Sequence, residues 1–89
     1  MRSVDVRVTG RVQGVFFRVS TRNRAVELGV AGTVRNELDG SVSISAEAEP
    51  PVLERFLEWV GNGPPNARVD ALDVRDRDPR GFSGFEVTG

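Results

Sequence analysis

Near its N-terminus the chain reads VDVRVTGRVQGVFFR, residues Val4 to Arg18, and this stretch indicates a strand followed closely by a helix. Valine at positions 4, 6 and 8 alternates with polar residues, a period of two that predicts a strand with one buried face. The strand is expected to end at Gly10. A helix is expected from about Phe17 to Leu28, because Gly29 then stands where glycine commonly ends a helix. The stretch therefore joins a strand to a helix through a short connection that contains glycine.

The remaining elements follow from the same patterns. Four further strands are predicted at Thr33–Leu38, Val42–Ala48, Val69–Val74 and Phe85–Val87. A second helix is predicted at Pro50–Val60. Asp39-Gly40 predicts a tight hairpin turn, since this pair tolerates the positive φ that such a turn needs. Pro50-Pro51 suits the first turn of the second helix. A slip in alternation at Ala71-Leu72 indicates a β-bulge, and Asp76–Gly81 reads as a polar loop.

The order of these elements predicts the fold. It is β-α-β-β-α-β with one further short strand, the ferredoxin-like split βαβ arrangement. We therefore predict an α+β two-layer sandwich, with a mixed sheet of four or five strands and both helices on one face. The 89 residues are expected to form one domain, 1–89.

Composition removes several classes of function. The chain has no His, Cys, Lys or Tyr, so zinc sites built on His and Cys are excluded. The general bases and covalent nucleophiles that remain are Ser, Thr, Asp and Glu. The net charge is −1, and the third strand has no aromatic residue on which a base could stack, so nucleic acid is not an expected partner. No apolar run is long enough to span a membrane. We expect a cytoplasmic, monomeric protein without membrane, metal or cofactor.

The predicted topology brings two distant polar residues together. In a split βαβ unit the first two strands are parallel, so Arg18, at the start of the first helix, and Asn36, at the end of the second strand, lie at one edge of the sheet. A glycine turn into a helix presents several N–H groups, which together favour an anion such as phosphate. Arg18 adds a planar guanidinium fork. On the pattern alone, a tight turn anchored by Phe16 and Phe17 remains the alternative.

These residues resemble a known family. Gly10–Arg18 is similar to the acylphosphatase signature G-x-V-Q-G-V-x-F-R, and Gly32–Asn36 resembles the family's second motif, in which the asparagine is catalytic. The resemblance implies a hydrolase that cleaves the carboxyl-phosphate bond of small acyl phosphates without a metal. Asn36 would position the attacking water. The phosphoryl group would be bound by the Arg18 side chain and by the backbone amides of Gln13, Gly14, Val15, Phe16, Phe17 and Arg18.

Some alternatives stay open at this point. Acylphosphatase-like domains also occur inside larger carbamoyl-transfer enzymes, so a non-catalytic phosphate-binding or accessory module is the second hypothesis. The start at Met1 and the presence of both Arg18 and Asn36 favour the free-standing enzyme. The side chain of Gln13 is expected either to shape the loop or to contact ligand. Val19 and Thr33 depart from the residues most frequent in the family, which leaves the preference for the acyl group open.

Overall fold

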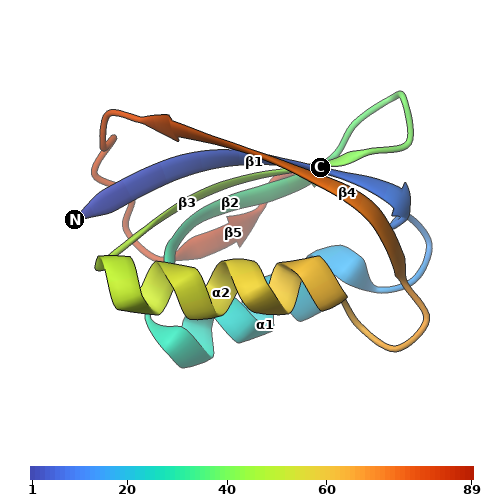
Figure 1. Ribbon diagram of the computed structural model, residues 1–89, viewed down its shortest axis with the longest axis horizontal. Helices are drawn as coiled ribbons and strands as arrows, with labels where there is room; N and C mark the ends of the chain where they lie inside the picture. Colours follow the sequence, from blue (N-terminus) through green and yellow to red (C-terminus); the bar gives the residue numbers. More distant parts are fainter.

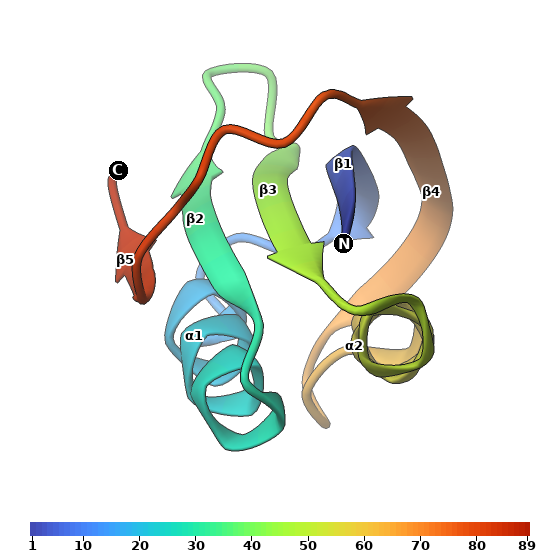
Figure 2. The same cartoon turned by 90° about the vertical axis from the view of Figure 1, so that its left-hand side faces the viewer.

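The computed structural model describes residues 1–89, in which five strands form one sheet and two helices cover one of its faces (Figures 1 and 2). In chain order the elements are β1 (Arg2–Arg11), α1 (Phe17–Leu28), β2 (Ala31–Asn36), β3 (Val42–Ala48), α2 (Pro50–Asn62), β4 (Arg68–Arg77) and β5 (Phe85–Val87). The strand order is β4-β1-β3-β2-β5, and only the pairing of β2 with β5 is parallel. The predicted α+β ferredoxin-like fold is confirmed.

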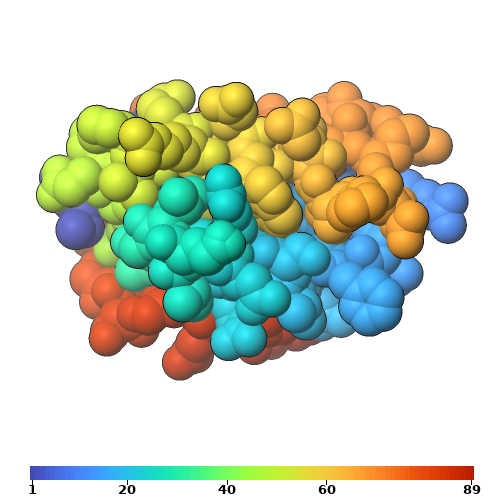
Figure 3. All heavy atoms as spheres, turned by 90° about the horizontal axis from the view of Figure 1, so that it is seen from below, coloured from blue at the N-terminus to red at the C-terminus, as the bar shows by residue number.

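The hydrophobic core lies between the sheet and the two helices. The alternating valines of β1 point into it, as their period of two predicts, and each is at most 3% exposed. The apolar stripe of α2 supplies Leu53, Phe56 and Val60, all buried, and α1 supplies Phe17 and Ala25. Figure 3 views this face, where α1 and α2 lie side by side. No helix is long and apolar enough to cross a membrane.

The register of the sheet fixes where the site residues lie. Both β1 and β2 pair antiparallel with β3, so they run in the same direction on either side of it. Their carboxyl ends therefore meet at one edge of the sheet, next to the start of α1 (Figure 1). The predicted juxtaposition of these two strand ends is confirmed.

The bounds predicted for the second strand were wrong by two residues. β2 begins at Ala31, because Ala31 and Gly32 already pair with Glu47 and Ala46 of β3. Gly32 approaches β3 so closely that a Cβ would lie 1.7 Å from the carbonyl oxygen of Ser45. β2 ends at Asn36, because the N–H of Glu37 donates to the carbonyl of Ser41 over 2.8 Å and closes a turn. The connection to β3 is thus longer than the tight Asp39-Gly40 turn that the sequence predicts.

The fourth strand also differs from its prediction. The extra residue of the bulge is Asp70, not the Ala71-Leu72 pair, because Thr9 pairs with Ala71 and Gly10 with Val69. The strand also continues through Asp76 and Arg77, which pair with β1, so the loop begins only after them. The sequence pattern missed this extension because exposed charged residues on an edge strand resemble a loop in composition.

Candidate active site

The connection between β1 and α1 turns sharply through two residues with left-handed backbones. Gly14 has φ 74°, which glycine adopts without strain, and Phe16 has φ 61° and ψ 24°. No N–H group of residues 13–18 donates a hydrogen bond within the protein, and no side chain caps α1. Unpaired N–H groups in a turn at a helix N-terminus form a concave site that favours an anion.

Arg18 is the second residue of α1 and is half-buried. Its Nη1 donates to the backbone oxygen of Gly89, the last residue of the sequence, which lies beyond the end of β5. It forms no ion pair with a carboxylate side chain, although most arginines of the chain do. A cation in the first turn also opposes the helix dipole. Both observations favour an anionic ligand beside Arg18.

Asn36 is the last residue of β2 and lies on the same side of the strand as buried Val34. Its Oδ1 atom is buried and accepts no hydrogen bond within the protein. Its backbone N–H donates to the Gly89 backbone oxygen over 3.3 Å. Buried polar atoms are nearly always paired, so an acceptor without a donor indicates that a ligand or water is needed there.

These groups line one cavity of about 230 Å³ at the edge of the sheet. Its walls are formed by Val12, Gly14, Phe16, Phe17, Arg18, Val19 and Asn36. Arg18 and Asn36, predicted to be neighbours although they are distant in sequence, do share this pocket. Val15 lies in the hydrophobic core instead, so within the loop its backbone alone is available to a ligand.

The side chain of Gln13 has a structural role. Its Nε2 donates to the carbonyls of Glu37 and Ser41, over 2.8 and 2.9 Å, and so ties the loop to the turn that follows Asn36. Between the two readings that the sequence left open, this contact supports loop shaping. These two hydrogen bonds join the Gly10–Arg18 motif to the turn that follows the Gly32–Asn36 motif.

The same turn is stabilised by Asp39. Donation from the hydroxyl and N–H of Ser41, assisted by the guanidinium of Arg7, lowers the pKa of the Asp39 carboxyl to about 2. The carboxylate is therefore ionised at neutral pH and fixes the 38–41 backbone through two bonds to Ser41, of 2.9 and 2.6 Å.

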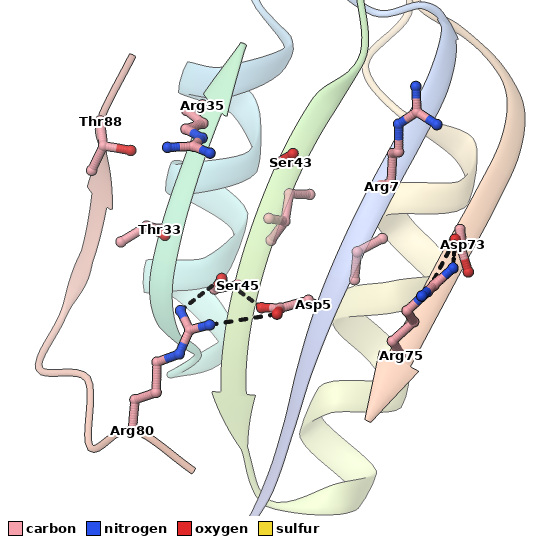
Figure 4. A pocket seen from close by; sticks show the side chains of 12 residues that line it. Asp5, Arg7, Thr33, Arg35, Ser43, Ser45, Asp73, Arg75, Arg80 and Thr88 are labelled. Atoms are coloured by element: carbon pink, nitrogen blue, oxygen red, sulfur yellow. Dashed lines mark hydrogen bonds and ion pairs between the residues drawn. The ribbon is translucent and has the colours of Figure 1, made fainter. Parts of the chain in front are cut away.

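A larger cavity of about 500 Å³ lies on the opposite, helix-free face of the sheet (Figure 4). Four arginines line it, but each is already paired with a carboxylate. The pairs are Arg7–Asp39, Arg35–Glu37, Arg75–Asp73 and Arg80–Asp5. This cavity offers no unpaired cation, so the smaller pocket is the better candidate for an anion site. No cluster of three or more carboxylates stands where it could bind a metal ion.

One contact in the site was not predicted. The backbone oxygen of Gly89 accepts from both Arg18 and Asn36, because β5 pairs in parallel with β2 and carries the following residues to the edge of the pocket. A contact made by a backbone oxygen leaves no signal in the sequence, and only the pairing of the last strand reveals it.

Comparisons with known proteins agree with this geometry. Residues 4–87 match the family model described as Acylphosphatase. The chain is 50% identical over 88 residues to an acylphosphatase of a Nocardioides species, covering 98% of this chain and 89% of that relative. The crystal structure of acylphosphatase from Bacillus subtilis superposes with a TM-score of 0.96 at 37% identity and full coverage of both chains.

A larger protein contains a similar fold. The crystal structure of full-length HypF, in its phosphate- and nucleotide-bound form, matches with a TM-score of 0.88 at 25% identity. The match covers 99% of this chain but 12% of that one. In contrast, the Nocardioides relative and the Bacillus structure match along almost their whole length. This chain belongs to the acylphosphatase family, whose activity is the hydrolysis of acyl phosphates.

Proposed function

We propose that the protein hydrolyses acyl phosphates in the pocket that Arg18 and Asn36 share. The observation that carries this proposal is the coincidence of three sets of groups in one cavity that can still bind a ligand. They are a guanidinium without an Asp or Glu partner, a buried Oδ1 without a donor, and the free N–H groups of the loop. An acyl phosphate supplies phosphoryl oxygens for the donors, and its hydrolysis requires a water for the acceptor.

The phosphoryl group is held by the loop and by Arg18. The N–H groups of residues 13–18 donate to its oxygens, and the helix dipole adds partial positive charge. Arg18 has five N–H donors, of which the Gly89 backbone oxygen engages Nη1, so the fork keeps donors for two phosphoryl oxygens. The Gly89 contact thereby orients the guanidinium.

Asn36 positions the attacking water. Its buried Oδ1, which accepts no hydrogen bond within the protein, accepts one from the water and so holds the water oxygen towards phosphorus. The water oxygen forms a bond to phosphorus as the bond from phosphorus to the bridging oxygen breaks, which releases a carboxylate and inorganic phosphate. The carboxylate leaves without protonation, since its pKa is near 4. The transition state is loose, so positioning and charge stabilisation carry the catalysis and neither a metal nor a covalent intermediate is needed.

The remaining parts of the proposal concern the protein as a whole. Residues 1–89 act as one domain and as a monomer in the cytoplasm, on small-molecule acyl phosphates and without a cofactor. The alternative, a non-catalytic phosphate-binding or accessory module of the same fold, is supported by the likeness to part of HypF. It predicts that phosphate binds while an acyl phosphate is not turned over.

Kinetics of single variants distinguish the role of Arg18, which binds the phosphoryl group, from that of Asn36, which positions the water. Arg18→Ala and Asn36→Ala are both expected to lower kcat by about 100-fold or more, as is typical for loss of one preorganised contact to the transition state. Competitive inhibition by inorganic phosphate should weaken strongly in Arg18→Ala and remain near the wild-type value in Asn36→Ala. Arg22→Ala, an exposed arginine one turn further along α1, is the matched control and should change neither value.

Two results would contradict these assignments. One is equal loss of phosphate inhibition in both variants, which would give Asn36 a role in binding the phosphoryl group. The other is found by hydrolysis in ¹⁸O-labelled water. The proposal predicts the label in inorganic phosphate, whereas label in the carboxylate would mean attack on the carbonyl carbon.

A further inference from the structure

The candidate pocket has an apolar wall that phosphate binding does not use. Phe16 and Val19 both line it, and their side chains are 79% and 49% exposed. Further inside, the wall continues with Val12 and Phe17, which are buried. The polar groups Arg18 and Asn36 therefore share the pocket with four apolar side chains, two of which are exposed.

Phe16 has a backbone conformation that is unfavourable for an aromatic residue. Its φ of 61° lies in the left-handed region, where it is the only residue of the chain other than glycine. Glycine or asparagine would adopt this backbone with less strain than an aromatic residue. The exposed ring gains little from burial, so the packing of the fold does not account for it. An unfavourable backbone together with an exposed aromatic ring at a pocket points to a contact with ligand.

The chemistry of the substrate says which part of it would meet this wall. In an acyl phosphate the acyl carbon is separated from phosphorus by one bridging oxygen. If the loop and Arg18 hold the phosphoryl group, the acyl substituent lies at the mouth of the pocket, within reach of its exposed rim. No charged side chain other than Arg18 lines the pocket, so nothing there would bind a second charge on the acyl group.

We infer that Phe16 and Val19 form an acyl subsite that selects acyl phosphates with an apolar, and especially an aromatic, acyl group. This inference rests on the proposed function and adds the class of substrate. An aromatic substituent stacks against the Phe16 ring and contacts the Val19 methyl groups, while an acetyl or carbamoyl group is too small or too polar to gain from either. A favourable aromatic contact contributes about 2- to 12-fold.

The test is the ratio of kcat/KM for benzoyl phosphate to kcat/KM for acetyl phosphate, measured with wild type and three variants. Phe16→Asn removes the ring and keeps a residue that tolerates the left-handed backbone, so it should fold and lower the ratio about 5- to 10-fold. Val19→Phe extends the aromatic wall and should raise the ratio by roughly 2- to 5-fold. Val26→Phe is the control. Val26 is exposed on the same helix two turns further on, outside the pocket, so its ratio should equal the wild-type ratio.

The outcomes distinguish this inference from the function on which it rests. If wild type hydrolyses both substrates but the ratio is unchanged in Phe16→Asn and Val19→Phe, the acyl subsite is refuted and the proposed function stands. An equal change in Val26→Phe also refutes it, since the effect would then be general. If folded wild type hydrolyses neither substrate, the proposed function fails and the subsite fails with it.

Discussion

Replacement of Glu47 tests how the fold holds its last strand. This glutamate lies on β3 and is only 2% exposed. Its Oε2 accepts from the Ser3 hydroxyl over 3.1 Å and from the N–H of Arg80, and its Oε1 accepts from the N–H groups of Gly81 and Phe82, each over 3.1 Å. One carboxylate thus fixes the segment that crosses from β4 to β5, and β5 leads to the backbone oxygen that contacts Arg18.

The cost of removing this carboxylate follows from the four bonds. A hydrogen bond contributes about 1 kcal/mol net, and more when one partner is charged, so four give at least about 4 kcal/mol. Burying the carboxylate itself costs free energy, which the Ala variant no longer loses, and this offsets part of the sum. We therefore expect Glu47→Ala to lose about 3 kcal/mol of unfolding free energy. This corresponds to a fall in Tm of about 12 to 24 °C for a domain of this size.

Glu47→Gln should cost about half as much. Its oxygen can keep the bonds from Gly81 and Phe82, and the Ser3 hydroxyl can reverse to accept from the new amide. Only the backbone N–H of Arg80 then loses its acceptor, because it faces the amide nitrogen of the new glutamine.

Urea denaturation of both variants measures these values, with Glu86→Ala, an exposed glutamate of β5, as the control expected within about 0.5 kcal/mol of wild type. Amide hydrogen exchange at Gly81 and Phe82 should quicken in Glu47→Ala. Glu47 variants as stable as the control, with unchanged exchange at these two amides, would show that this carboxylate does not hold the segment between β4 and β5.

Three further predictions follow from the fold and the site. Gly32→Ala places a Cβ at 1.7 Å from the Ser45 carbonyl at a φ of 151°, so it should cost more than about 3 kcal/mol, or prevent folding, in urea denaturation. Folding lowers the pKa of Asp39 from 3.8 to about 2 through Ser41 and then Arg7. The stability that this shift contributes is therefore complete above about pH 4 and lost as the pH falls towards 2. In Asp39→Asn the urea midpoint should fall less steeply between about pH 4 and about pH 2 than in wild type. An equally steep fall would show that Asp39 is not the source of this pH dependence. Because no histidine is present, kcat should be nearly constant from about pH 5 to 8, and a steep limb near neutrality in the pH–rate profile would argue for a titrating catalytic group.

The site was predictable where topology alone determines it. The parallel arrangement of the first two strands follows from the element order, and it brings Arg18 and Asn36 to one edge whatever the details of packing. The loop between Gly10 and Arg18 was readable because its glycine and the following helix leave N–H groups without partners.

Contacts made by the backbone or by a covered surface were not predictable. In SVSISAEA the alternation assigns Glu47 to the polar, solvent-facing side of its strand. It is nevertheless buried, because the crossing segment at residues 80–82 folds over that end of the sheet and donates to its carboxylate. Local periodicity says which face a residue takes, but not which distant segment covers that face. The contacts of the Gly89 backbone oxygen were missed for the same reason.

Whether Arg18 and Asn36 catalyse hydrolysis together is tested by turnover of benzoyl phosphate in the presence of EDTA by wild type, Arg18→Ala and Asn36→Ala, with circular dichroism to confirm that each is folded. We expect an active wild type, unaffected by EDTA, and a loss of about 100-fold or more in both folded variants. Folded variants that retain wild-type turnover, or a wild type that EDTA inactivates, would contradict hydrolysis by a water held between these two residues.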